Sequence, residues 1–138
     1  MSFFDQLGAL FAKYDVLGAF WVNIQLTFWA AIGSFVLGAI LALMRISPVP
    51  SLRWAGTIYV HLFRNTPLTI LMTLALLGVW TQFQLSFSTD FETNFFVYAV
   101  IVLSIYHASF VCEAIRSGVN TVPTGQAEAA RAIGLGFM

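Results

Sequence analysis

Charge is scarce in this sequence, and the shortage limits the classes of protein to consider. Of the 138 residues, six are Lys or Arg and six are Asp or Glu, whereas 59% are hydrophobic. A soluble domain carries about 25% charged residues. The composition therefore excludes a disordered chain and disfavours a soluble globular fold. The net charge is zero and basic runs are lacking, so nothing indicates a nucleic-acid partner.

Disulfides, metal-ligand clusters and catalytic sets are also missing. The single cysteine, Cys112, cannot form an intramolecular disulfide, and we interpret it as a small apolar residue of a helix. His61 and His107 lack Cys, Asp or Glu at ligand spacing, which argues against a metal site; for His107 we expect packing or hydrogen bonding across helices. The sequence has neither a phosphate-binding Gly-x-x-x-x-Gly-Lys-Ser/Thr motif nor a nucleophile–base–acid set, so we predict no cofactor and no enzymatic activity.

The N-terminal residues lack the basic start of a secretory signal, so we expect no cleavage there. Phe3, Leu7, Leu10 and Tyr14 instead recur at helical spacing. This pattern predicts a short extracytoplasmic amphipathic segment over residues 1–15, lying on the membrane surface. A frayed terminus is the alternative.

Long uncharged segments are what the sequence has in quantity. The first runs from Val16 to Met44 without a charged residue. Because a helix rises about 1.5 Å per residue, about 20 residues cross the hydrocarbon core of a bilayer. The segment predicts a membrane helix over about 17–44. Arg45 and Arg53 then flank two prolines in a short loop, which is typical of the cytoplasmic side.

Small residues recur every four positions along this first helix, at Ala30, Ser34, Gly38 and Ala42. Such a stripe lets a second helix approach closely, and packing contacts then hold the two together within the membrane. We therefore predict a packed helix rather than a lone anchor. The alternative is chance, since Ala and Gly are common in membrane helices.

The second apolar segment is interrupted. We predict a cytoplasmic-side helix over 51–63, a break at Arg64-Asn65-Thr66-Pro67, and a membrane helix over about 66–86, with Asn65 or Thr66 as its cap and Pro67 in its first turn. A charge at a membrane helix centre costs roughly 2.5–3.5 kcal/mol. Arg64 therefore either anchors a helix end at the interface or binds a substrate carboxylate.

The third apolar segment predicts a membrane helix over about 93–112. An acidic connection containing Asp90 and Glu92 precedes it, as expected outside the cell, and this charge asymmetry puts the N-terminus outside and the C-terminus in the cytoplasm. Glu113 and Arg116 follow, one helical turn apart, and can form a surface ion pair of little energetic weight.

The last residues are of a different kind. We predict a polar connector over 117–126, followed by a short Ala-rich helix over 127–133 that ends at Gly134. Its small faces would let a partner surface come close, and Glu128 and Arg131 could pair with each other or with that partner. The two interpretations are a docking element and an ordinary solvated helix.

At this point the residues resemble a known family. The stretch from Glu113 to Gly136, with Gly125-Gln126-Ala127-Glu128-Ala129-Ala130-Arg131 at its centre, resembles the EAA loop of ABC importer permeases. Arg64-Asn65-Thr66-Pro67-Leu68 is similar to a motif of their polar amino-acid uptake branch, and residues 26–45 are similar to its first core helix. Within that branch the residues of these two motifs look most like those of actinobacterial glutamate-uptake permeases.

This resemblance implies an all-α membrane protein with three transmembrane helices of the type I ABC importer permease core, in a bacterial cell membrane. Residues 16–138 would form a partial transmembrane type-1 domain, with a cytoplasmic coupling loop over 113–138. The residues implied to couple to the ATPase are Gly125, Gln126, Glu128, Ala129, Ala130, Arg131 and Gly134. Arg64, Thr66 and Pro67 are candidates for the substrate path or a helix break.

The resemblance also implies a function and partners. A permease subunit of this kind moves a polar, here glutamate-like, amino acid into the cytoplasm by alternating access. Its partners would be an ABC ATPase subunit, a second permease subunit, an extracytoplasmic amino-acid-binding protein and membrane lipid. Because the family usually continues with two further helices, we expect a truncated coding sequence or a fragment. The alternatives are a non-transporting membrane adaptor or scaffold and an inactive truncated permease; a membrane enzyme is disfavoured.

Overall fold

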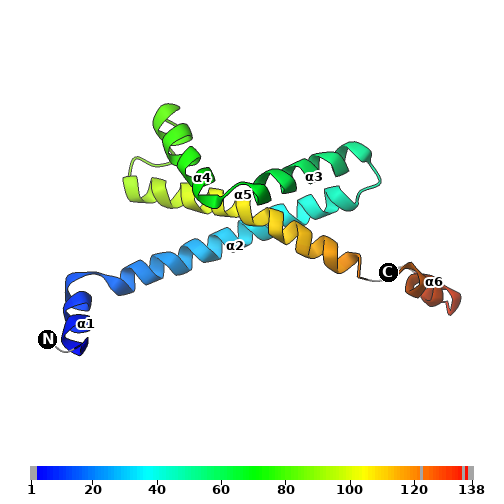
Figure 1. Cartoon of the computed structure of the whole chain (residues 1–138), viewed down its shortest axis with the longest axis horizontal. Coiled ribbons are helices and arrows are strands. Elements are labelled where there is room, and N and C mark those ends of the chain that lie inside the picture. Colours follow the sequence, from blue (N-terminus) through cyan, green and yellow to red (C-terminus); the bar gives the residue numbers. More distant parts are fainter. Residues whose placement is uncertain (1–2, 122, 135, 137–138) are drawn as a thin grey trace.

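The computed structural model describes residues 3–121, 123–134 and 136, and its regular structure is helical throughout these ranges. Two long helices, α2 and α5, cross each other, with α1 near one end of the molecule and α6 at the other (Figure 1). The elements in chain order are α1 (Phe3–Lys13), α2 (Val16–Ile46), α3 (Pro50–Asn65), α4 (Leu68–Thr73), the π-helix η1 (Leu74–Gln82), α5 (Phe91–Val119) and α6 (Thr124–Ala132).

Two of these helices, α2 and α5, are long and apolar enough to cross a membrane as straight segments. The third candidate is a bent pair, in which α3 meets the α4–η1 segment at 98°. The first and third predicted spans thus correspond to α2 and α5, whereas the second, predicted over about 66–86, corresponds to the α4–η1 part of the bent pair. Helix α1 lies where the amphipathic segment is predicted.

The ends of α2 follow from local chemistry. The Asp15 carboxylate accepts a hydrogen bond from the Gly18 backbone N–H at 2.9 Å and caps the first turn. Ser47 is extended at the other end, where Pro48 disfavours helical geometry in the residue before it. The helix therefore covers and slightly exceeds the predicted range 17–44.

The small-residue stripe of α2 is buried against α5, which confirms the packing prediction. Ala30, Ser34, Gly38 and Ala42 are all buried. A Cβ added at Gly38 would lie 2.6 Å from Val111 Cβ and 3.0 Å from a backbone oxygen of α5. Helix α5 therefore lies too close to α2 at this point for any side chain larger than hydrogen.

A small core forms where α2, α3 and α5 meet. The fully or nearly fully buried residues of this cluster are Leu41, Ala42, Val60, Ala108 and Cys112. The burial of Cys112 confirms its interpretation as a small apolar packing residue. Tyr59 of α3 packs beside the cluster and donates its hydroxyl hydrogen to the Ile105 carbonyl oxygen at 2.8 Å.

The bend after α3 occurs at two extended residues, Thr66 and Pro67, within the stretch where the sequence places a break. The predicted cap is wrong: α3 continues through Asn65, Pro67 is itself the N-cap of α4, and no side chain caps that helix. The Thr66 hydroxyl instead donates to the Leu62 carbonyl oxygen at 2.8 Å, one turn back in α3. Helical structure after the bend runs from Leu68 to Gln82, inside the predicted range 66–86.

Candidate functional site

The connector before α6 is shorter than the predicted 117–126, because α5 does not end where its apolar run ends. Helix α5 runs on to Val119, past the predicted boundary at 112. Charged residues end a hydrophobic segment, but Glu and Arg are good helix formers, and the Asn120 N–H still donates to the Arg116 carbonyl oxygen at 3.1 Å. The Thr121 hydroxyl completes the turn by donating to the Gly118 carbonyl oxygen at 2.7 Å.

Helix α6 starts earlier than the predicted 127 and stops as predicted. Pro123 is extended and precedes the first turn, where the Gln126 N–H donates to the Pro123 carbonyl oxygen at 3.0 Å. Gly125 and Gln126 therefore belong to the helix and not to the connector. At the other end Gly134 adopts a φ of +84°, a left-handed conformation that glycine takes without strain, which confirms the predicted stop.

The predicted coupling residues gather on this one short helix and its stop. All of them are exposed except Ala130, which is partly buried. In the described part of the chain α6 packs extensively against no other helix, and it projects beyond the end of α5 (Figure 1). The structure thus presents α6 as a surface helix attached through α5. The predicted loop 113–138 also includes Val122, Leu135, Phe137 and Met138, which lie outside the described residues.

The break residues form a separate region. The exposed guanidinium of Arg64 lies over the Phe110 ring of α5, with Cζ 5.4 Å from the ring centroid. This is a cation–π arrangement, which holds the last turn of α3 against α5. Thr66 and Pro67 make the bend itself. In the described residues the structure does not pack this region against α6.

A shallow groove of about 420 Å³ runs between α2 and α5. Its polar lining comes from Asn23, Thr27 and Ser34 on α2 and from His107 on α5, with Phe110 at one side. His107 is exposed, and its ring packs edge-on against Tyr106 at a centroid distance of 5.3 Å. This ring contact lies within α5, so the expected contact of His107 across helices stays a prediction.

Sequence reasoning missed the residues that fasten the connection between η1 and α5. The side-chain oxygen Oδ1 of the buried Asn94 accepts hydrogen bonds from the backbone N–H groups of Phe87, at 2.8 Å, and Ser88, at 3.3 Å. Tyr98 donates its hydroxyl hydrogen to the Leu85 carbonyl oxygen at 2.7 Å. An asparagine in an apolar helix is the one signal that could have indicated such a role, because a buried amide needs a partner.

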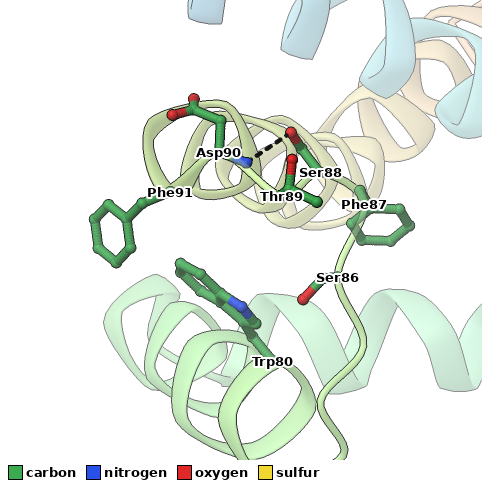
Figure 2. A pocket seen from close by; sticks show the side chains of 7 residues that line it. All are labelled: Trp80, Ser86, Phe87, Ser88, Thr89, Asp90 and Phe91. Atoms are coloured by element: carbon green, nitrogen blue, oxygen red, sulfur yellow. Dashed lines mark hydrogen bonds between the residues drawn. The ribbon is translucent and has the colours of Figure 1, made fainter.

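This connection borders a hollow of about 510 Å³, which Trp80 and Phe91 flank with ring centroids 5.2 Å apart (Figure 2). Asp90 caps α5: its carboxylate accepts from the Thr93 N–H at 2.8 Å, and its own N–H donates to the Ser88 hydroxyl oxygen at 3.1 Å. Hydrogen bonds from the Thr93 side chain and backbone hold the pKa of Asp90 below its ordinary value.

An ionic cluster at the start of the predicted coupling loop was also missed. Sequence reasoning expected a surface pair of Glu113 with Arg116, and the structure does pair them at 3.1 Å. Glu113 is, however, only 22% exposed, and it also accepts a hydrogen bond from Arg45 of α2. The predicted pair with Arg116 thus forms, but its carboxylate is partly buried and also joins two helices; the small energetic weight of the Glu113–Arg116 pair stays a prediction. No sequence signal links residues so far apart in the chain.

Comparison with known proteins identifies the family to which this sequence is similar. Residues 11–137 match the family described as binding-protein-dependent transport system inner membrane component. The chain is 48% identical to the glutamate transport system permease protein GluC of Corynebacterium efficiens over 128 residues, which are 89% of this chain and 56% of that protein. It is 34% identical to the glutamate/aspartate import permease protein GltJ of Escherichia coli K12, over 92% of this chain and 56% of that protein.

A solved structure agrees in fold. The crystal structure of an amino acid ABC transporter with histidines matches with a TM-score of 0.68 and 30% identity, over 81% of this chain and 49% of that chain. The chain thus spans about half the length of the relatives that it matches. With a family match over most of its length and helices that can cross a membrane, the chain belongs to the inner membrane components of binding-protein-dependent transport systems.

Proposed function

We propose that the chain is permease machinery of an ATP-driven importer, which moves a glutamate-like amino acid into the cytoplasm by alternating access. The observation that carries the proposal is α6, a short exposed helix that a membrane-length helix presents beyond its end. Glutamate appears in the names of the two relatives described above, and this supports the choice of substrate. ATP hydrolysis belongs to a separate ATPase subunit.

Helix α6 is the docking element for that ATPase. Its exposed residues include Gly125, Gln126 and Ala129, which are small or polar and let another surface approach closely. Glu128 and Arg131 supply opposite charges three residues apart on the same helix. Gly134 turns the chain directly after it. This role requires α6 to be cytoplasmic, hence an outside N-terminus, as the Arg45–Arg53 loop favours.

Arg64, Thr66 and Pro67 are proposed to form the bend that lets the α4–η1 segment enter the membrane, with Arg64 as an anchor. The Phe110 contact supports anchoring over capture of a substrate carboxylate, because the guanidinium already lies over a ring of the protein. The remaining proposed partners are a second permease subunit, an extracytoplasmic amino-acid-binding protein and lipid.

Co-purification tests the docking role. The full chain, expressed with the ATPase and binding-protein subunits of its own cell, should retain the ATPase on an affinity tag placed on the permease. Glu128→Arg or Gly134→Val should reduce the bound ATPase and its stimulation by the loaded binding protein. Ser86→Ala, in the exposed connection before α5, is the control and should change neither. If the Glu128 and Gly134 variants bind and stimulate the ATPase like the unaltered protein, the docking role is wrong.

A further inference from the structure

One cluster of charges lies outside every role proposed above. Arg45 Nη1 of α2 donates to Glu113 Oε1 of α5, while Arg116 Nε and Nη2 donate to Glu113 Oε2 at 3.2 and 3.1 Å. Each oxygen of the Glu113 carboxylate thus has its own arginine. Arg116 stands one turn along the same helix, whereas Arg45 reaches across from another helix.

The link to Arg45 is the more enclosed of the two. The Arg45 side chain is 11% exposed, against 38% for Arg116. Its stem crosses Gly56 of α3 so closely that a Cβ there would lie 2.8 Å from Arg45 Cγ. Helices α2, α3 and α5 therefore converge on this side chain, directly beside the buried core around Cys112. An ion pair that is shielded from water in this way is screened by salt less than a surface pair.

The cluster lies near the end of α5 that leads to α6. Helix α6 joins the rest of the described chain through α5, and Glu113 lies less than two turns before α5 ends at Val119. Among the described ion pairs, Arg45–Glu113 is the one that ties this terminal part of α5 to another helix. This pair therefore links α2 to the part of α5 that carries α6.

We propose that Arg45 and Glu113 are positioning residues for coupling, which lock the α6-bearing end of α5 to α2 so that the two helices move as one body. The inference rests on the proposed function. ATPase closure that displaces α6 then moves α2 together with α5, instead of bending the last turns of α5 alone. Arg116 orients the carboxylate from within α5 and does not connect two helices.

The test uses the full chain reconstituted with its ATPase and binding-protein partners in proteoliposomes. It measures amino acid taken up per ATP hydrolysed for Glu113→Gln, Arg45→Gln and the double variant. We expect each single change to lower this ratio about fivefold or more, as for loss of a coupling free energy between sites. The double variant should be no worse than either single one, since both remove the same link.

Two matched arginine controls separate the link between helices from loss of charge in general. Arg116→Gln should stay within about twofold of the unaltered protein, because the Arg116 pair lies within α5 and its loss leaves the link between Glu113 and Arg45 in place. Arg53→Gln, an exposed arginine in the same region, should have no effect. Additive losses in the double variant, or equal losses for Arg116→Gln, would overturn the proposal.

A distance measurement supplies a readout that a general loss of stability would not produce. Spin labels at the exposed positions Leu43 on α2 and Val119 on α5 should keep one separation with and without ATP in the unaltered complex. In Glu113→Gln the separation should change when ATP binds, while the amount of assembled complex stays the same. An unchanged separation in that variant contradicts the proposal.

Two outcomes need separate treatment. If a single variant fails to assemble, Arg45→Gln/Glu113→Gln decides by the same two readouts, because it leaves neither charge of the pair unpaired; a normal ratio and a constant label distance in it reject the proposal. Failure of the proposed function looks different, since the unaltered protein would then show no ATP-driven uptake at all.

Discussion

At Gly38 the missing side chain sets how closely α5 can approach α2. The neighbours of an added Cβ include a backbone oxygen, which cannot rotate away, as well as the branched side chain of Val111. The contact therefore depends on glycine for space. At this position of the stripe the geometry leaves no room for a larger residue.

We predict that Gly38→Leu lowers the free energy of unfolding by about 1–3 kcal/mol, since overpacking forces helices apart. Thermal unfolding in detergent micelles measures the change. Gly118→Ala, in the other long helix α5, is the control, because nothing lies within 4 Å of an added Cβ at that position. Equal melting temperatures for Gly38→Leu and the unaltered protein would contradict the packing described.

Asn94 is the buried side chain that holds the connection before α5. We predict that Asn94→Ala costs about 1–3 kcal/mol, because two backbone N–H groups lose their acceptor. Hydrogen exchange at Phe87 and Ser88 should accelerate, while exchange in the middle of α5 stays unchanged. Ser86→Ala, in the same exposed connection, should leave these amides as they are. Unchanged exchange at Phe87 in Asn94→Ala would show that other contacts hold the loop.

Sequence alone predicts some of these residues and not others. The Ala30–Ser34–Gly38–Ala42 stripe and Cys112 are predictable because spacing and residue size determine which helix face can be buried. Glu113 is different. Its pairing with Arg116, the nearest charged residue in the sequence, can be predicted from their spacing. Arg45 becomes a partner only because α2 and α5 cross.

Among the elements, the bend between α3 and α4 depends on proline. Pro67 sits extended with a φ of −61°, and a proline disfavours helical geometry in the residue before it. We predict that Pro67→Ala partly straightens the 98° bend, because Thr66 is then free to continue the helix. Spin labels at the exposed residues Ile58 and Leu77 should move apart and show a broader distance distribution.

Thr66→Ala is the matched control for that experiment. It removes the hydroxyl that bonds to Leu62 but keeps the proline, so the label separation should match that of the unaltered protein. If Pro67→Ala also leaves the separation unchanged, the bend is held by tertiary packing rather than by the proline.

The start of α5 has a pH dependence that follows from its cap. Hydrogen bonds with Thr93 lower the pKa of Asp90 from its ordinary value of 3.8, so the capping bond is present at neutral pH. Its contribution to stability exists above that ordinary value and is lost as the pH falls through the lowered pKa. We predict that the NMR shift of the Thr93 amide titrates with a midpoint below 3.8. In Asp90→Asn this titration should disappear; a midpoint above 3.8 in the unaltered protein would contradict the cap.

The element boundaries show what hydropathy can and cannot determine. The apolar run ends near Cys112, yet α5 continues to Val119, because a helix needs backbone hydrogen bonds and good helix formers, whereas a hydropathy boundary marks only a change of solvent. The π-helical segment Leu74–Gln82 has no counterpart in the sequence prediction, since its apolar pattern fits an α-helix as well. Gly134, by contrast, was predictable because a left-handed helix stop favours glycine.

At the scale of the whole molecule, the chain is two crossed membrane-length helices with a bent pair against them and an exposed helix, α6, at one end (Figure 1). Many exposed side chains of α2 and α5 are large and apolar, as expected for helices that face lipid or further protein. The family match fixes the class of the protein, and we propose that a movement of α6 is passed to the membrane helices through α5.

The central claim is that α6 couples ATP hydrolysis to transport, and uptake of radiolabelled glutamate into proteoliposomes tests it most directly. The full chain, with its ATPase and binding protein, should take up glutamate only when ATP is supplied. Ala129→Trp, which puts a bulky ring on the exposed face of α6, should abolish ATP-driven uptake. Ala114→Trp, at an exposed alanine of α5, should leave it near normal. Full uptake by Ala129→Trp, or no ATP-driven uptake by the unaltered complex, would contradict the account.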